Sequence, residues 1–157
     1  MSHIKRRVGQ AGVYFVSSRT WQSRALFRRP EIATLLVDQL LDCRARGFYK
    51  LHAFVVMPDH FHALLTPAAT VSLEMAMQMI KGGSSRTIKQ VLNYLSPVWQ
   101  KGFHDRWIRN AEEYKARRDY IGGNPVAARL ATKSEEYLFS SASGRHEMDA
   151  SQFGIAA

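Results

Sequence analysis

The sequence predicts an α+β fold, a ferredoxin-like βαββαβ antiparallel sheet with helices on one face plus a C-terminal tyrosine-bearing helix. Candidate elements follow the order strand, helix, strand, strand, helix, strand, which is the order of that core. Right-handed crossovers would place both main helices on the same face of the sheet. The length of 157 residues is typical of one compact domain. We therefore expect a single domain over residues 1–157, with loose ends at 1–12 and 144–157.

The first strand and the first helix are predicted from residue type and spacing. Residues 13–18 are rich in β-branched and aromatic side chains, which is typical of a strand. Pro30 suits the first turn of a helix, apolar residues then recur at helical spacing, and Gly47 is a plausible stop. Cys43 belongs to that apolar series, so we interpret it as a core residue and not as a nucleophile.

A hairpin and a second helix follow. Residues 48–57 and 60–66 predict two strands, because the Pro58-Asp59 pair between them has the chemistry of a tight turn. Ser72 can cap a helix whose apolar pattern resumes after Gly82-Gly83 and continues until Pro97.

The last elements are a fourth strand and a third helix. Residues 98–100 and 103–108 predict a strand or a short hairpin. Asn110, with Glu113 three residues later, resembles a capping box for a helix that reaches about Ile121. Pro125 is expected to end any helical structure by residue 124.

The charge distribution favours a polyanionic partner. The chain has 22 Lys and Arg against 13 Asp and Glu, a net charge of +9, and residues 1–30 contain basic side chains but no acid. Such a surface attracts nucleic acid, although a solvated basic face would look the same. No apolar run approaches the ~18 residues of a membrane span, and the single cysteine excludes an internal disulfide. We expect a cytoplasmic protein.

The strongest local motif is His60-Phe61-His62. Because side chains alternate along a strand, the two histidines project from the same side and could supply adjacent ligands to a divalent metal. The alternative is a pair of histidines hydrogen-bonded on a half-exposed sheet face. His52 on the preceding strand is a weaker candidate.

The third helix offers groups that would complete a phosphodiester-cleaving site. Tyr120 and Asn124 are one turn apart and share a face if the helix runs that far. Asn124 could give a carbonyl oxygen to a metal, Tyr120 could be a nucleophile, and Arg117 could contact a phosphate. Taken singly, Tyr120 is better explained as an amphipathic interface residue and Asn124 as a residue at a helix C-terminus before proline. Together with the histidines they indicate covalent phosphodiester chemistry.

The segments MPDHFHALL, WQKGFHDRWIR and YIGGNPV, followed by YLFSSA, resemble the single-tyrosine HUH transposases, and most closely the REP-associated tyrosine transposases of bacteria. The resemblance implies that His60 and His62 bind the metal, with Asn124 as the third ligand. It implies that Tyr120 takes a 5′-phosphate and leaves a free 3′-hydroxyl. The implied metal is Mg²⁺ or Mn²⁺, and the implied substrate is hairpin-forming single-stranded DNA near palindromic repeats. The protein would be nucleoid-associated and either a monomer or a homodimer.

One feature departs from the expected pattern, because Gly122-Gly123 between Tyr120 and Asn124 weakens the helix. The pair indicates either a loose tyrosine helix or one that moves between two positions. Candidate DNA-binding residues are spread over three segments and comprise Arg24, Lys81, Ser85, Arg86, Lys89 and Arg117.

Two other functions fit the same fold. A non-catalytic protein could bind the hairpin DNA and regulate loci that contain the repeats. A third possibility is RNA binding, since related βαββαβ folds recognise RNA, although the strands lack a clear aromatic pattern of that kind.

Overall fold

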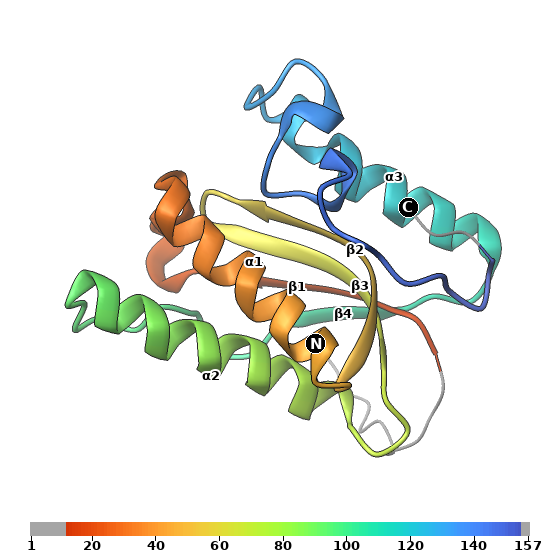
Figure 1. Cartoon of the computed structure of the whole chain (residues 1–157), viewed down its shortest axis with the longest axis horizontal. Helices are drawn as coiled ribbons and strands as arrows, with labels where there is room; N and C mark the ends of the chain where they lie inside the picture. Colours follow the sequence, from red (N-terminus) through yellow and green to blue (C-terminus); the bar gives the residue numbers. More distant parts are fainter. Residues whose placement is uncertain (1–11, 155–157) are drawn as a thin grey trace.

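The computed structural model describes residues 12–154, and it contains one antiparallel four-stranded sheet (Figure 1). The strand order is β2-β3-β1-β4, which is the predicted ferredoxin-like arrangement. The strands are β1 (Tyr14–Arg19), β2 (Tyr49–Met57), β3 (His60–Pro67) and β4 (His104–Trp107). The β2–β3 hairpin places Met57 opposite His60, as the turn at Pro58-Asp59 predicts.

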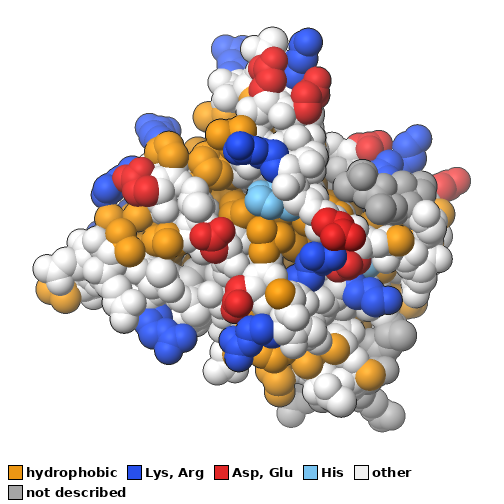
Figure 2. All heavy atoms as spheres, viewed as in Figure 1, with side chains coloured by type: hydrophobic (Ala, Val, Ile, Leu, Met, Phe, Trp, Pro, Cys, Tyr) orange, Lys and Arg blue, Asp and Glu red, His pale blue; other side chains and the backbone are white. Residues whose placement is uncertain are grey.

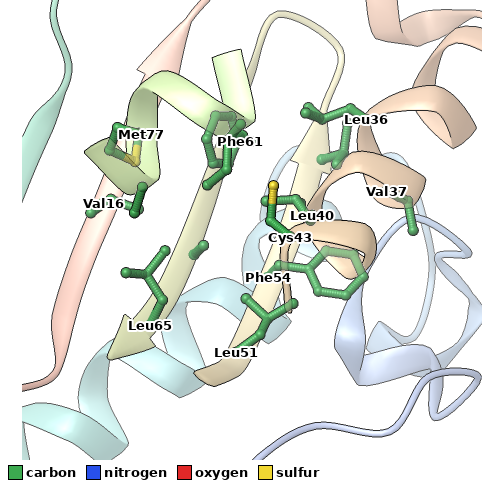
Figure 3. Close-up of a cluster of buried hydrophobic side chains, with 14 of the residues drawn as sticks. Val16, Leu36, Val37, Leu40, Cys43, Leu51, Phe54, Phe61, Leu65 and Met77 are labelled. Atoms are coloured by element: carbon green, nitrogen blue, oxygen red, sulfur yellow. The ribbon is translucent and has the colours of Figure 1, made fainter. Parts of the chain in front are cut away.

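Helices cover both faces of the sheet. As predicted, α1 (Pro30–Ala45) and α2 (Leu73–Leu92) share one face. The structure places α3 (Ala111–Ala127) on the opposite face (Figure 1). The larger core lies under α1 and α2, where Cys43 is buried beside Leu40 and Phe54 (Figure 3). Cys43 is thus a core residue, as predicted. Four short 3₁₀ helices complete the described elements, at Trp21–Ser23, Leu26–Arg28, Ser134–Glu136 and Ser141–Ser143.

A β-bulge at His52 decides which side chains of β2 face which core. The pairing shifts between Leu51 and Ala53, so Leu51 faces α1 and α2 whereas Ala53 faces α3. His52 itself is fully buried, and its Nδ1 and Nε2 are hydrogen-bonded to the Asp149 carbonyl and the Thr66 hydroxyl. Both ring nitrogens are therefore engaged, and His52 is not part of the histidine pair on β3.

The second helix begins as predicted and ends earlier. The Ser72 hydroxyl accepts a hydrogen bond from the Met75 N–H at its start. The helix ends at Leu92 and not near Pro97, because Asn93 adopts the left-handed conformation (φ 49°) that terminates helices. Gly83 leaves room for the Gln39 side chain of α1, whose amide donates to the Met79 carbonyl.

The third helix runs further than predicted. The Asn110 side chain accepts from the Glu113 N–H, but the Glu113 carboxylate accepts from the Arg109 N–H, so only half of the capping box forms. The helix continues through Pro125 to Ala127. A proline in the last turn removes one N–H, and the Ala128 N–H still donates to the Asn124 carbonyl. Tyr120 and Asn124 therefore belong to one continuous helix.

Of the two alternatives predicted before the third helix, the fourth strand forms and the short hairpin does not. β4 begins at His104 and pairs with β1, whereas Trp99 makes only an isolated bridge to Thr20 at the end of β1. The intervening residues 100–103 leave the sheet.

The C-terminal segment covers the free edge of β2. The Ser141 hydroxyl accepts from the Phe54 N–H and donates to the Phe54 carbonyl, which satisfies groups that an edge strand leaves open.

The C-terminal end was predicted to be loose, but its described residues 144–154 pack against the rest of the domain. The Asp149 carboxylate bridges the Arg44 guanidinium and the Leu51 N–H, and the Phe153 ring lies against Tyr114. Residues 1–11 and 155–157 of the predicted loose ends lie outside the described residues.

Candidate active site

The two histidines of β3 project from the sheet face that α3 covers, as the alternation predicts. Phe61 between them packs into the opposite core. The rings of His60 and His62 lie with centroids 4.8 Å apart at an interplanar angle of 74°. The strand therefore presents two imidazoles side by side beneath the tyrosine helix.

The His62 side chain is buried beneath α3. Its side chain is only 8% exposed, and neither ring nitrogen has a partner within residues 12–154. Burial, followed by the positive charges around it, lowers the pKa of His62 to about 3. The ring is therefore neutral at physiological pH, which is the form that binds a metal. Phe15 stacks on it at 5.2 Å and fixes its plane.

His60 is oriented by an acidic neighbour. Its Nδ1 lies 2.6 Å from one Asp59 carboxylate oxygen, and Arg19 donates to the other at 2.8 Å. A carboxylate on Nδ1 fixes the tautomer and leaves Nε2 as the acceptor, as is usual for metal-binding histidines. Asp59 was predicted only as a turn residue, although an acid directly preceding the histidine pair was the available signal.

Tyr120 stands over this pair. Its ring contacts His62 edge-on with centroids 5.4 Å apart, and it also contacts Phe15 at 6.1 Å. Nearly half of the Tyr120 side chain remains exposed, so its hydroxyl is open to a substrate. Sequence reasoning did not identify Phe15 as part of the site, because only the fold brings β1 beneath α3.

Two further residues of α3 accompany Tyr120. The Arg117 guanidinium lies 4.9 Å from the centroid of the Phe15 ring, one turn before the tyrosine. Asn124 lies one turn after it and is half-buried. The intervening Gly122 and Gly123 are regular helical residues, and an added Cβ at Gly123 would meet nothing within 4 Å. No local strain or steric demand accounts for the Gly123 residue.

The donor set fits a divalent metal if an oxygen joins the histidines. No group of three His, Cys, Asp or Glu side chains arranged for a metal occurs within residues 12–154. The unpartnered nitrogens of His62 and the directed Nε2 of His60 supply two donors. The Asn124 amide oxygen is the candidate third, since amide oxygens suit Mg²⁺ and Mn²⁺.

The predicted DNA-binding residues occupy different environments. The Lys81 ammonium is half-buried and donates to the Gln100 and Gly102 carbonyls, so it holds a loop and is not free for a phosphate. Arg24 donates to the Tyr94 hydroxyl at 2.6 Å and keeps an exposed guanidinium edge. On the same helix as Lys81, Arg86 is exposed, while Ser85 and Lys89 are half-exposed.

On the side drawn in Figure 2, Lys and Arg side chains are interspersed with Asp and Glu. Within residues 12–154, no helix is both long and apolar enough to cross a membrane.

Comparisons with known proteins identify the family. A family model described as IS200-like transposase matches residues 19–124. A REP-associated tyrosine transposase of Escherichia coli (strain K12) is 25% identical over 143 residues, which make up 89% of this chain and 82% of that protein. These matches confirm the resemblance predicted from the motifs.

Two solved structures share the fold. One is a REP-associated tyrosine transposase bound to a REP hairpin, with a TM-score of 0.72, 22% identity and coverage of 100% of this chain and 96% of that one. The other is a putative transposase from Deinococcus radiodurans R1, with a TM-score of 0.55, 20% identity and coverage of 77% and 95%.

Proposed function

This chain belongs to the IS200-like transposase family, and we propose that it nicks and transfers single-stranded DNA beside a hairpin through a 5′-phosphotyrosine at Tyr120. The observation that carries the proposal is the position of Tyr120, whose ring lies against His62 of the same chain while its side chain stays half-exposed. A hydrolase that activated water would have no use for a tyrosine at that place.

The chemical step is a displacement at phosphorus. The Tyr120 hydroxyl oxygen forms a bond to phosphorus as the bond from phosphorus to the 3′-oxygen breaks. The phenolic proton is lost to solvent, and the departing oxygen takes up a proton to become a 3′-hydroxyl. Because the phosphotyrosine conserves the phosphodiester bond, another 3′-hydroxyl can reverse the step and rejoin the strands without a nucleotide cofactor.

The residues beneath Tyr120 would hold a divalent metal, Mg²⁺ or Mn²⁺. His60 Nε2, His62 and the Asn124 amide oxygen are the proposed ligands. When bound, such an ion neutralises charge on a nonbridging phosphate oxygen. Asp59 keeps the His60 ring in place, and Arg117 adds positive charge beside Phe15, where the phosphate would approach.

The DNA partner is proposed from charge and from the relatives. The net charge of +9 favours a polyanion, and a protein of the same fold was solved with a REP hairpin. Arg24, Arg86, Lys89 and Ser85 are the proposed contacts to the strand outside the catalytic site.

Covalent adduct formation tests the proposal. Wild type, Tyr120→Phe and the control Tyr137→Phe would be incubated with labelled hairpin DNA, with Mn²⁺ or with chelator, and resolved on denaturing gels. We expect an adduct only with Mn²⁺ and only when Tyr120 is present. An adduct formed by Tyr120→Phe would overturn the nucleophile assignment. Tight hairpin binding without any adduct, over a panel of repeat hairpins, would instead indicate a regulatory DNA-binding protein.

A further inference from the structure

His104, the first residue of β4, faces the same side of the sheet as the histidine pair. Ser17 of β1 is paired with His62 of β3 on one side and with His104 on the other. Residues that lie directly opposite one another in an antiparallel ladder project from the same face. Because His62 points toward Tyr120 of α3, His104 projects from the α3 side as well. His62, Ser17 and His104 therefore form one row across three strands.

This row borders a cavity of about 250 Å³. His60 and His62 line the cavity from β3, and His104 lines it from β4. His104 is exposed, whereas His62 is buried. The His104 imidazole is thus accessible to a DNA strand that enters the cavity beside the histidine pair.

The backbone on both sides of His104 fixes its position. Before it, residues 100–103 leave the ladder, and the Lys81 ammonium of α2 donates to the Gln100 and Gly102 carbonyls. Gly102 has φ +75°, a conformation that glycine adopts without strain, and the chain rejoins β1 at His104. After His104, the strand continues as a regular partner of β1 to Trp107. The imidazole is therefore carried by hydrogen-bonded backbone.

His104 does not join the histidine pair as a metal ligand. Within residues 12–154, no three His, Cys, Asp or Glu side chains are arranged to hold one metal ion. The strand β1 lies between β3 and β4, so the backbones that carry His62 and His104 are about 10 Å apart. A phosphate group fits between side chains at that separation, so His104 is placed to act on the substrate from the side opposite the histidine pair.

The proposed cleavage requires a proton at the departing 3′-oxygen. An alkoxide is a much stronger base than a phenolate, so it is the poorer leaving group of the two. Without a proton for the 3′-oxygen, the phosphotyrosine would revert by losing the tyrosine faster than the strand could depart. An acid near the scissile phosphate therefore favours the forward step.

We propose that His104 is the catalytic residue that supplies this proton. The inference rests on the proposed function and deepens it by naming the donor. The Tyr120 oxygen bonds to phosphorus, the bond from phosphorus to the 3′-oxygen breaks, and its electron pair stays on that oxygen, which takes a proton from the His104 imidazolium. Solvent then reprotonates the imidazole. In rejoining, the neutral imidazole takes the proton from the attacking 3′-hydroxyl.

The other polar side chains at the cavity are less suited to this exchange. His60 and His62 are the proposed metal ligands. Arg19 is paired with the Asp59 carboxylate, and a guanidinium does not give up its proton. The Lys101 ammonium can attract a phosphate but has no lone pair with which to accept a proton in the reverse step. An imidazole both gives and takes up protons between about pH 5 and 8.

A sulfur substitution in the DNA tests the proposal. Adduct formation would be timed in single turnovers with Mn²⁺, for wild type and His104→Gln. One substrate is the ordinary hairpin DNA, and the other carries sulfur in place of the bridging 3′-oxygen at the cleaved linkage. We expect His104→Gln to slow adduct formation on the oxygen substrate by at least about 100-fold. On the sulfur substrate the two proteins should differ by less than about threefold, because a thiolate departs without a proton.

Controls separate proton transfer from a loss of structure. Since His104 is exposed, His104→Gln should match wild type in melting temperature and in Mn²⁺ affinity measured by calorimetry without DNA. His146→Gln alters a histidine that packs against Phe54 of β2, at the opposite edge of the sheet, and should leave both adduct rates unchanged. Equal slowing of His104→Gln on the two substrates would overturn the proton-donor role, and so would an unchanged rate on the oxygen substrate.

The result is distinguishable from the fate of the proposed function. A Tyr120-dependent adduct that forms equally fast in wild type and His104→Gln would overturn the role of His104 and leave the nicking activity. A wild-type protein that forms no adduct on either substrate, over a panel of repeat hairpins, would overturn the nicking activity and the role of His104 together.

Discussion

Tyr120 lies edge-on against His62 of the same chain, with ring centroids 5.4 Å apart. The helix that carries the tyrosine thus reaches its own histidine pair, without a helix from a second copy. Phe15 contacts both rings and fixes their relative position. The candidate nucleophile and a candidate metal ligand are therefore held together by the core that α3 forms with the sheet.

Asp59 should determine metal affinity. Its carboxylate orients His60 through Nδ1, and removal of such a partner typically weakens metal binding by about 10–100-fold. We expect that loss for Asp59→Ala when Mn²⁺ binding is measured by calorimetry without DNA. Asp42→Ala, which breaks an exposed ion pair with Arg46 on α1, is the matched control. Equal Mn²⁺ affinities for wild type and Asp59→Ala would contradict the assignment.

His52 should make stability depend on pH. Burial lowers its pKa below the ordinary value near 6.5, so below that pH the unfolded chain takes up a proton that the folded protein excludes. The stability that the neutral His52 contributes to the folded protein is fully present above about pH 6.5 and declines as the pH falls. Urea unfolding would be measured in chelator between pH 7.5 and 5.5. As the pH falls, the free energy of unfolding should decrease more steeply for wild type than for His52→Gln, by at most about 1.4 kcal/mol per pH unit. Parallel curves would show that His52 is not the responsible group.

Gly123 should tolerate alanine. An added Cβ meets nothing within 4 Å, and the residue is helical, so Gly123→Ala should raise the free energy of unfolding by up to about 1 kcal/mol. Gly83→Ala should raise the free energy of unfolding by less, because its Cβ would displace the Gln39 amide that donates a hydrogen bond to the Met79 carbonyl.

The same Gly123→Ala variant tests movement of the tyrosine helix. We expect its rate of adduct formation to match that of wild type, since the helix is regular at this position. A rate at least tenfold lower, with higher stability, would mean that the glycine is needed for motion.

Lys81 and Lys89 should differ in their effects on DNA binding, although both lie on α2. Binding to DNA weakens with salt, and the salt dependence is the slope of the logarithm of the binding constant against the logarithm of salt concentration. Neutralising a lysine that contacts phosphate reduces the magnitude of this slope by about one. We expect that change for Lys89→Met and no change for Lys81→Met, whose ammonium is engaged by two loop carbonyls. Anisotropy titrations over a range of salt concentrations measure both slopes. A reduced slope for Lys81→Met would mean that its ammonium also reaches the DNA.

Local patterns in the sequence were sufficient to predict the strand order, the hairpin and the shared face of His60 and His62. Alternation along a strand and turn chemistry at Pro58-Asp59 are short-range effects, so they can be recognised without the fold. The end of α3 was predicted incorrectly, because a proline in the last turn costs only one hydrogen bond and the helix continued to Ala127. The prediction that residues 144–154 are loose was also wrong. Asp149 holds this segment through partners that are distant in sequence, so no local pattern indicates them.

The sequence by itself therefore determined the order of the elements, the basic charge and the residue types proposed for the site: two histidines, a tyrosine and an asparagine. Tertiary structure alone decided that Arg19 holds the Asp59 carboxylate beside His60, that Phe15 lies beneath Tyr120, and that Lys81 holds a loop. The physical reason is that these contacts join residues far apart in the chain, and their geometry depends on sheet register and helix packing, which local propensity does not encode.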